Sequence, residues 1–392
     1  MKKIMLISFF CFMKIVYSQI SSISDDNFKS SNFTENSILN KSLENVEIIA
    51  LGEPSHYMKE TYVSKIKLIK YLHKKLNFDV LAFEAPMYNL NQINDSVRLG
   101  LASSKLFRQN NAGVWNIKEM DELYEYIIET YKTDRPLIYV GFDQSFYKSN
   151  IFIPELKSFL KEKNVTNIDD RYFDAIQFVV EHSFSFKKSS VADTALISST
   201  NKEILSKISE KNFKNKFWKK QLQNIESVYR NDYKVGNRDE TMFENVKFIK
   251  EEMYPNKKMI LWGATIHFVD NTLLTVDKLK TLKTKVGYFL KKEYKDKYYI
   301  LGFTPGEGNA GVKGYLGLMN LKIKSPKNSV ENLIQKNCEC NYAFVSFNGF
   351  DSAKLTSNII GSKQFEYDNL SKIVDGLFYL KTETLINFKE EQ

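Results

Sequence analysis

Four short apolar runs recur along the chain, and each ends near a glycine or an acidic residue. They are rich in β-branched and aromatic residues, which is typical of buried strands. The runs read VEIIALGE, DVLAFEA, PLIYVGFD and KMILWGAT. Between the first two, apolar residues recur at helical spacing over 57–76, with lysines on the other face. This strand–helix–strand order predicts parallel neighbouring strands, because right-handed crossovers of this kind join parallel strands.

The pattern changes in the middle of the chain. From about 150 to 255 the sequence shows helical periodicity with hardly a strand signal, and apolar strand-like runs return after 258. We therefore predict an α/β fold with a mostly parallel central sheet flanked by helices and a large all-helical insertion at about 150–255. No linker or repeat divides the chain, so we predict one domain over 19–392.

The N-terminus has the layout of a secretory signal peptide. Lys2 and Lys3 precede a short apolar stretch that ends at Ser18. Its longest uninterrupted run, 4–12, is too short to span a bilayer permanently. We expect cleavage of residues 1–18, export to the periplasm or the medium, and no stable membrane span afterwards. An uncleaved anchor is the alternative.

Composition narrows the class of protein. The chain has 392 residues, of which 43% are hydrophobic, so it can bury a large core. Loss of the three lysines in 1–18 lowers the formal net charge from +9 to +6. The remaining lysines are scattered over helical faces, which argues against a nucleic-acid partner. Cys338 and Cys340 are one residue apart, and we expect free thiols because a disulfide over so short a span would be strained.

Polar residues follow the strand-like runs where a ligand would bind. In parallel sheets, ligands bind beyond the carboxyl ends of the strands. Glu53 and His56 follow the first run, Glu84 ends the second, Asp143 ends the third and His267 follows the fourth. An imidazole can take a proton from water near neutral pH, and a nearby carboxylate can fix its tautomer. We therefore expect these residues to share one crevice.

Each candidate also has a purely structural interpretation. Glu53 could cap the helix that follows it, Glu84 could form a buried salt bridge, and Asp143 could cap a turn. His73 and His182 fall within helices, His73 on the lysine-rich polar side, and are interpreted as bystanders. The sequence has no G-x-S-x-G, H-E-x-x-H or P-loop motif, and GEGNAG at 306–311 is interpreted as a glycine loop.

A family resemblance emerges from the order and spacing of several motifs. They are LGEPSH, LAFEAP, VWNIKEMDELYEYI, VGFDQ, NRDETMFENVKFI and LWGATIHFVDN. Together they resemble the erythromycin esterase family over about 46–303. The resemblance implies a hydrolase that needs no cofactor or metal, acting on a small-molecule ester. In it a histidine would activate water against the ester carbonyl, with no covalent serine intermediate.

The same resemblance assigns roles to individual residues. His56 would be the general base, Glu53 and Glu84 its orienting carboxylates, and His267 would complete the catalytic set. A second group would bind the substrate, with Arg238 of the Arg238-Asp239 pair holding the oxyanion. Its members are Trp115, Glu119, Asp143 and Arg238.

The sequence also departs from the family pattern. Tyr57 stands where the family has glycine after the histidine, Pro54 and Ser55 replace its Ala-Thr, and Ala264 replaces the first histidine of the late pair. Two alternatives therefore stay open. The same His/Glu cluster could hold a divalent metal that activates water, or the protein could be a non-catalytic exported ligand-binding protein.

Overall fold

The structure is a computed structural model that describes residues 20–386, apart from 112, 148, 184–186, 188, 231–237, 275–283, 314–319, 348–353 and 362. The predicted signal peptide at 1–18 lies outside the described residues. The chain divides into two compact units. The first comprises Met1–Asp79, Ile117–Leu123 and Lys258–Gln392, and the second comprises Val80–Asn116 and Tyr124–Lys257. The prediction of a single domain over 19–392 stays a prediction.

A mixed sheet forms the centre of the first unit. Its strands follow the order β1 (Ile20–Ile23), β8 (Tyr342–Ser346), β11 (Gly376–Glu383), β6 (Tyr298–Gly311), β2 (Ile48–Glu53) and β5 (Lys258–Ala264). Strands β11, β6, β2 and β5 run parallel, whereas β8 pairs antiparallel with β1 and β11. The short β7 (Asn320–Ile323) pairs with the end of β6, and β9 (Leu355–Ser357) pairs with β10 (Phe365–Tyr367). The predicted α/β class is confirmed.

Helices of the first unit lie around this sheet. The longest is α4 (Lys59–Leu76), which packs against β6 and β11 through an apolar face that includes Tyr62, Ile66 and Ile69. It ends at Leu76, and the following residue, Asn77, adopts the left-handed conformation that commonly terminates helices. The others in the described part of this unit are α2 (Asp25–Lys29), α3 (Ser37–Ser42), α13 (Thr265–Phe268), α15 (Val286–Tyr294), α16 (Val330–Cys338) and the 3₁₀ turns η2 (Lys118–Met120), η4 (Asn271–Leu273), η5 (Lys295–Lys297) and η6 (Leu370–Lys372).

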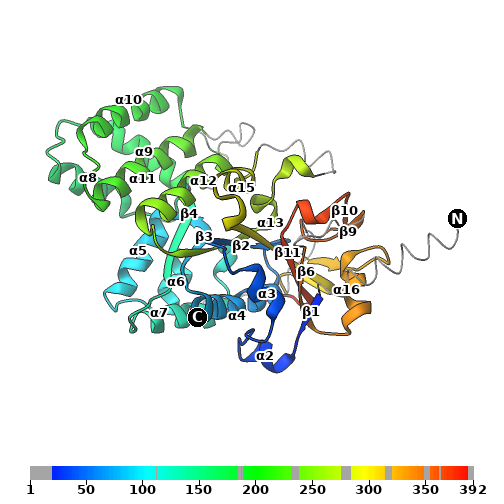
Figure 1. Cartoon of the computed structure of the whole chain (residues 1–392). Coiled ribbons are helices and arrows are strands. Elements are labelled where there is room, and N and C mark those ends of the chain that lie inside the picture. Colours follow the sequence, from blue (N-terminus) through cyan, green and yellow to red (C-terminus); the bar gives the residue numbers. More distant parts are fainter. Residues whose placement is uncertain are drawn as a thin grey trace. The chain divides into compact units, whose positions relative to one another are not determined.

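The second unit is mainly helical. Two parallel strands, β3 (Phe78–Pro86) and β4 (Ile138–Asp143), are followed by helices, and β3 enters this unit at Val80. Every described element between 150 and 255 is helical, as predicted, and α8 to α11 lie beside one another (Figure 1). The described helices are α5 (Met87–Arg98), α6 (Ser104–Asn110), the 3₁₀ turn η1 (Gly113–Trp115), α7 (Asp121–Thr130), whose first three residues belong to the first unit, α8 (Phe152–Glu162), α9 (Asp170–His182), α10 (Val191–Lys207), α11 (Phe213–Arg230), α12 (Arg238–Phe248) and a π-helix (Ile249–Met253). None of the helices described is long and apolar enough to cross a membrane.

The structure corrects two expectations about the C-terminal part of the chain. GEGNAG at 306–311 is the end of strand β6 rather than a loop, and its glycines allow β11 to approach closely. A Cβ on Gly306, for example, would lie 2.9 Å from the Lys381 carbonyl oxygen. The second correction concerns the two cysteines at the end of α16.

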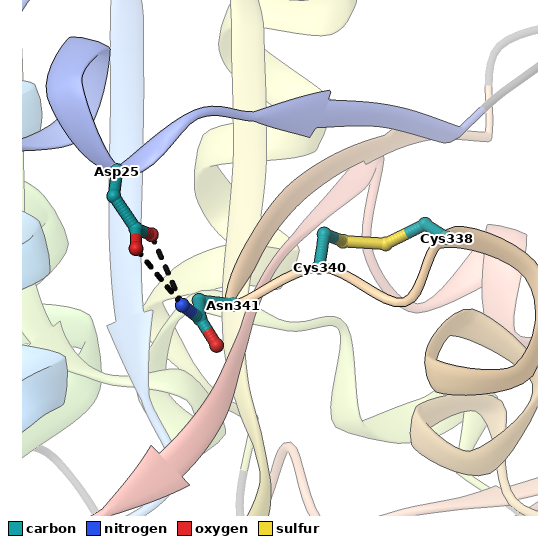
Figure 2. Close-up of a disulfide and its surroundings, with 4 residues drawn as sticks. All are labelled: Asp25, Cys338, Cys340 and Asn341. Atoms are coloured by element: carbon teal, nitrogen blue, oxygen red, sulfur yellow. Dashed lines mark hydrogen bonds between the residues drawn. A yellow bond between two sulfur atoms is a disulfide. The ribbon is translucent and has the colours of Figure 1, made fainter.

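Cys338 and Cys340 form a disulfide instead of two free thiols (Figure 2). The residue between them, Glu339, has a φ of 45°, and the two Cα atoms lie 5.2 Å apart, within the usual range for a bridge. The left-handed turn therefore brings the two cysteines close enough for a bridge over this short span. The adjacent Asn341 donates to both carboxylate oxygens of Asp25 at 3.1 Å, which ties this turn to the start of α2.

Candidate functional site

In the first unit, Glu53 and His56 form a contact at the carboxyl end of β2. Glu53 is the last residue of the strand and is fully buried, whereas the His56 side chain is 34% exposed. The Nδ1 atom of His56 lies 3.0 Å from Oε1 of Glu53. A carboxylate at Nδ1 favours the tautomer that has its proton there and its lone pair on Nε2. The sequence predicted this pair, and the structure brings the two residues together.

A third member of this cluster, Lys65, was missed by the sequence analysis. Lys65 is fully buried on α4, and its ammonium group forms an ion pair with Oε2 of Glu53. It also lies 4.9 Å from the centre of the Trp262 ring and 3.4 Å from the Gly263 carbonyl oxygen. Glu53 is thus shared between His56 and Lys65 and does not cap the helix. The available signal was a lysine on the apolar face of α4, but neighbouring surface lysines obscured it.

His267 lies at the carboxyl end of the neighbouring strand. Strands β2 and β5 are parallel, Glu53 is the register partner of Ala264, and α13 with the half-buried His267 follows directly. A Cβ on Gly52 would lie 2.7 Å from Oγ1 of Thr265, so glycine is needed for α13 to lie against β2. The first unit therefore places the His56 loop and His267 at the carboxyl ends of two adjacent strands, as predicted.

In the second unit, Arg238 joins two acidic side chains. Its guanidinium donates to Oε1 of Glu84 at 3.0 Å and, through Nε, to Oδ2 of Asp143 at 3.1 Å. Glu84 and Asp143 are buried, whereas a third of the Arg238 side chain is exposed. Burial lowers the pKa of Arg238, but the charges of Asp143 and Glu84 outweigh that effect and raise it above its usual value. The salt bridge considered for Glu84 therefore exists, and Arg238 stays charged.

Local structure explains why these three residues meet. Asp143 ends β4, and its Oδ1 accepts from the backbone N–H of Ser145 at 2.9 Å. Arg238 is the first residue of α12, which is attached to β4 by the Asn245 side chain donating to the Phe142 carbonyl at 3.0 Å. The arginine was predicted from the family motif, and the structure supplies its partners.

Three further residues named by the motifs lie in different surroundings. Trp115 is buried, with its ring edge-on to Phe83 at 5.3 Å, so its contacts are those of a core residue. Asp239 is also buried, at the start of α12. Glu119 belongs to the first unit, and its Oε2 is buried without a hydrogen-bond partner in the described part of the chain. Such an atom is unusual in folded proteins and suits a group that binds a ligand or water.

The two remaining histidines are apart from these clusters. His73 is buried rather than on the polar side of its helix, and its Nε2 lies 3.8 Å from Oδ1 of Asp79. Nδ1 of His182 contacts the carbonyl of Phe178, one turn earlier in α9, at 2.9 Å. Both contacts are structural, in agreement with the bystander interpretation.

Comparison with known proteins identifies the family. The sequence profile described as "Erythromycin esterase" matches residues 73–382. The chain belongs to the erythromycin esterase family. It is also 26% identical over 302 residues to "Putative hydrolase YbfO" of Bacillus subtilis (strain 168), a match that covers 67% of this chain and 66% of that protein. The chain therefore spans slightly less than two thirds of that relative.

Solved structures share the fold. A succinoglycan biosynthesis protein superposes with a TM-score of 0.79 at 17% identity, covering 96% of this chain and 98% of the other. A mutant of the erythromycin esterase EreC in its open conformation gives a TM-score of 0.63 at 16% identity, covering 93% and 98%. A Bacillus cereus protein gives 0.79 at 19% identity, covering 97% and 98%. At these identities the likeness concerns the fold alone.

Membership of the erythromycin esterase family also bears on Tyr57, whose backbone conformation is strained. Tyr57, at the position where the family resemblance expects glycine, has a φ of 63°. Only glycine adopts this left-handed region without steric cost. Two backbone hydrogen bonds fix this loop. The N–H of Gly311 donates to the Tyr57 carbonyl at 2.8 Å, and the N–H of Gly361 donates to the Pro54 carbonyl at 2.6 Å. The turn after His56 therefore keeps its left-handed conformation even though a tyrosine stands in place of the glycine.

Proposed function

We propose that this erythromycin esterase family member is an exported hydrolase of carboxylic esters or lactones in which His56 activates water. The contact between His56 Nδ1 and Glu53 Oε1 is the observation that carries this proposal. Family membership and the similarity to a protein named as a hydrolase support it. The substrate would be a small molecule.

The proposed reaction needs one proton carrier. Nε2 of His56 takes a proton from water while the water oxygen adds to the carbonyl carbon of the ester. The tetrahedral intermediate then collapses, the bond to the leaving oxygen breaks, and the imidazolium returns its proton to that oxygen. The products are a carboxylic acid and an alcohol, and no bond to the enzyme forms.

Glu53 and Lys65 make this proton cycle favourable. The carboxylate of Glu53 holds the imidazole by Nδ1 and stabilises the positive charge that develops on it. Lys65 offsets the burial of Glu53, since a buried carboxylate without a cation would favour its neutral form. The three groups together are neutral when His56 is neutral and carry a charge of +1 when it is protonated.

Glu84, Asp143 and Arg238 have a different electrostatic character. Two carboxylates share one guanidinium, so the cluster has a net charge of −1. Arg238 as an oxyanion ligand stays a prediction, and this net charge also suits hydroxyl or ammonium groups of a substrate. Glu84 and His267 in the catalytic set, and Trp115, Glu119 and Asp143 as substrate-binding residues, likewise stay predictions.

Export is part of the proposal. It rests on the layout of residues 1–18, and the Cys338–Cys340 disulfide supports it because disulfides persist mainly in oxidising compartments. Fractionation of the native host, followed by N-terminal sequencing, tests it directly. We expect a mature chain that begins at Gln19 outside the cytoplasm; full-length protein in the cytoplasm would overturn this point.

The activity is tested with purified mature protein and a panel of small esters and macrolactones. We expect turnover that falls by about a hundredfold or more in His56→Asn, the scale of general-base catalysis. His182→Asn, which changes a histidine outside the cluster, is the matched control and should keep full activity. Loss of turnover with a strong chelator would favour the metal-dependent alternative. Ligand binding without any turnover would favour a binding protein.

A further inference from the structure

A buried carboxylate from the end of the chain contacts the beginning of α4. Glu383 is the last residue of β11 and is 1% exposed. Its Oε1 accepts from the backbone N–H of Glu60 at 2.6 Å, and its Oε2 accepts from the backbone N–H and the hydroxyl of Thr61 at 3.1 and 2.6 Å. The N–H of Thr384 also donates to Oε1, at 3.2 Å. Four donors therefore converge on one carboxylate.

This contact replaces a local helix cap. Helices α3 and α16 are capped by the side chains of Asn36 and Ser329, which directly precede them. The equivalent residue of α4 is Met58, an apolar side chain buried with Ala310 and Ile323 and a poor cap. The backbone N–H groups of the first turn still need an acceptor, and a negative charge there is favourable. Glu383 supplies the acceptor oxygens from 323 residues away, and it adds the negative charge once it is ionised, above its raised pKa of about 8.

The position of this cap ties it to the His56 cluster. Helix α4 begins three residues after His56 and also carries Lys65, which pairs with Glu53. Any shift of its first turn would move both partners of Glu53. The Gly311 and Gly361 contacts to the preceding loop come from the same C-terminal part of the chain.

We propose that Glu383 is a positioning residue for the hydrolysis assigned above to His56. By holding the first turn of α4, it fixes the loop that presents His56 and the helix that presents Lys65. The inference rests on the proposed function for its effect on turnover, but its structural part can be measured independently.

The energetics indicate why a hydrogen-bond acceptor is needed there. Burial raises the pKa of Glu383 to about 8, whereas the hydrogen bonds from Thr61 and from the backbone of Glu60 lower it. An apolar side chain would avoid the cost of burying this group. It would, however, leave the N–H groups of Glu60 and Thr61 without their acceptor.

Strand β11 offers a matched control. Asp375 immediately precedes it at the opposite end, where its carboxylate accepts from the backbone N–H of Ile300 at 2.8 Å and from Lys291 at 3.1 Å. Asp375→Ala thus removes the same kind of carboxylate–backbone contact from the same strand. The strand has eight residues, so the two ends are roughly 25 Å apart.

The experiment compares Glu383→Ala, Glu383→Gln and Asp375→Ala with the wild type by three readouts. These are amide exchange of Glu60 and Thr61, the imidazole ¹⁵N shifts of His56, which report its tautomer, and kcat and KM on an ester from the panel. For Glu383→Ala we expect about tenfold faster exchange. We also expect loss of the Nδ1–H tautomer signal and about a tenfold lower kcat with KM within about twofold. Glu383→Gln retains one acceptor and should recover part of each effect.

The outcomes separate the two proposals. Asp375→Ala should leave exchange at Glu60, the His56 signal and kcat unchanged. The positioning role is overturned if Glu383→Ala leaves the His56 signal as in the wild type, or if Asp375→Ala alters it equally. If the wild type hydrolyses no ester while Glu383→Ala still changes the exchange and the His56 signal, the proposed function fails and the positioning of His56 stands.

Discussion

The two charged clusters have opposite ratios of carboxylates to basic groups. In the first unit, one buried carboxylate, Glu53, is shared by two basic groups, His56 and Lys65. In the second unit, one cation, Arg238, is shared by two buried carboxylates, Glu84 and Asp143. Each cluster lies near the carboxyl end of a parallel strand and is completed by a cation on a helix, Lys65 on α4 or Arg238 on α12.

The difference lies in which group can exchange a proton. His56 is a third exposed and has an imidazole, the side chain that titrates near neutral pH. Arg238 is equally exposed, but the neighbouring acids raise its pKa above an already high value, so it keeps its proton. We therefore propose that proton transfer takes place in the first cluster, whereas the second contributes fixed charge. The predictions below test this division, beginning with the largest effect.

Removing the buried cation of the first cluster should have the greatest effect. Lys65→Met leaves Glu53 buried without its ion-pair partner, and breaking such a pair typically costs about 3–5 kcal/mol. We expect this loss in the free energy of unfolding, measured by denaturant titration, together with loss of turnover. The double variant Glu53→Gln/Lys65→Met should regain much of the stability but none of the activity. Wild-type stability in Lys65→Met would contradict the pairing.

Disrupting the second cluster should lower the free energy of unfolding by less, and this decrease should not depend on pH near neutrality. Because Arg238 is partly exposed, Arg238→Gln should cost about 3 kcal/mol, at the lower end for buried pairs. A raised pKa means that the contribution of Arg238 to stability is fully present below the ordinary pKa of an arginine and is lost only above it. The cost measured at about pH 6 and about pH 9 should therefore agree. A clear decrease at the higher pH would show that a titrating group dominates this cluster.

Crowding at the end of β2 should lower the stability by an amount between the effects of the ion-pair variants and of the turn after His56. Gly52→Ala places a methyl group 2.7 Å from Oγ1 of Thr265, so α13 and His267 must shift. Overpacking of this kind costs about 2 kcal/mol, and we expect a lower melting temperature with reduced turnover. Gly113→Ala is the matched control, because its Cβ would meet nothing within 4 Å. Equal melting temperatures for the two variants would argue against close packing of α13 on β2.

The smallest effect should come from the strained turn after His56. Tyr57→Gly and Tyr57→Ala both remove the ring, but only glycine relieves the left-handed conformation at a φ of 63°. The glycine variant should be more stable than the alanine variant by about 1 kcal/mol in denaturant titrations. A more stable alanine variant would show that the turn relaxes when the ring is removed.

Sequence patterns predicted the local features of this protein well. The helix predicted at 57–76 is α4, the helical stretch at 150–255 is observed, and Glu53 meets His56 because only two residues separate them. What the sequence could not reveal depended on distant contacts. Lys65 resembles the surface lysines around it until the sheet is in place, and Glu383 reaches α4 from the far end of the chain.

Backbone conformation explains the other failures. The Cys338–Cys340 bridge needs the left-handed Glu339, which residue type alone did not indicate. GEGNAG contains three glycines, a composition typical of loops, yet their lack of side chains is what allows β11 to pair closely along β6. Pairing across a sheet thus overrode local propensity in this region.

Chemical rescue tests the central claim most directly. In His56→Ala, added imidazole can occupy the vacated space and accept the proton from water. The rate is compared with that of imidazole in buffer alone and with that of Arg238→Ala under the same conditions. The account predicts that imidazole restores turnover in His56→Ala in proportion to its neutral form, and that it does not rescue Arg238→Ala. Wild-type turnover in His56→Ala without imidazole would contradict the assignment of His56 as the base.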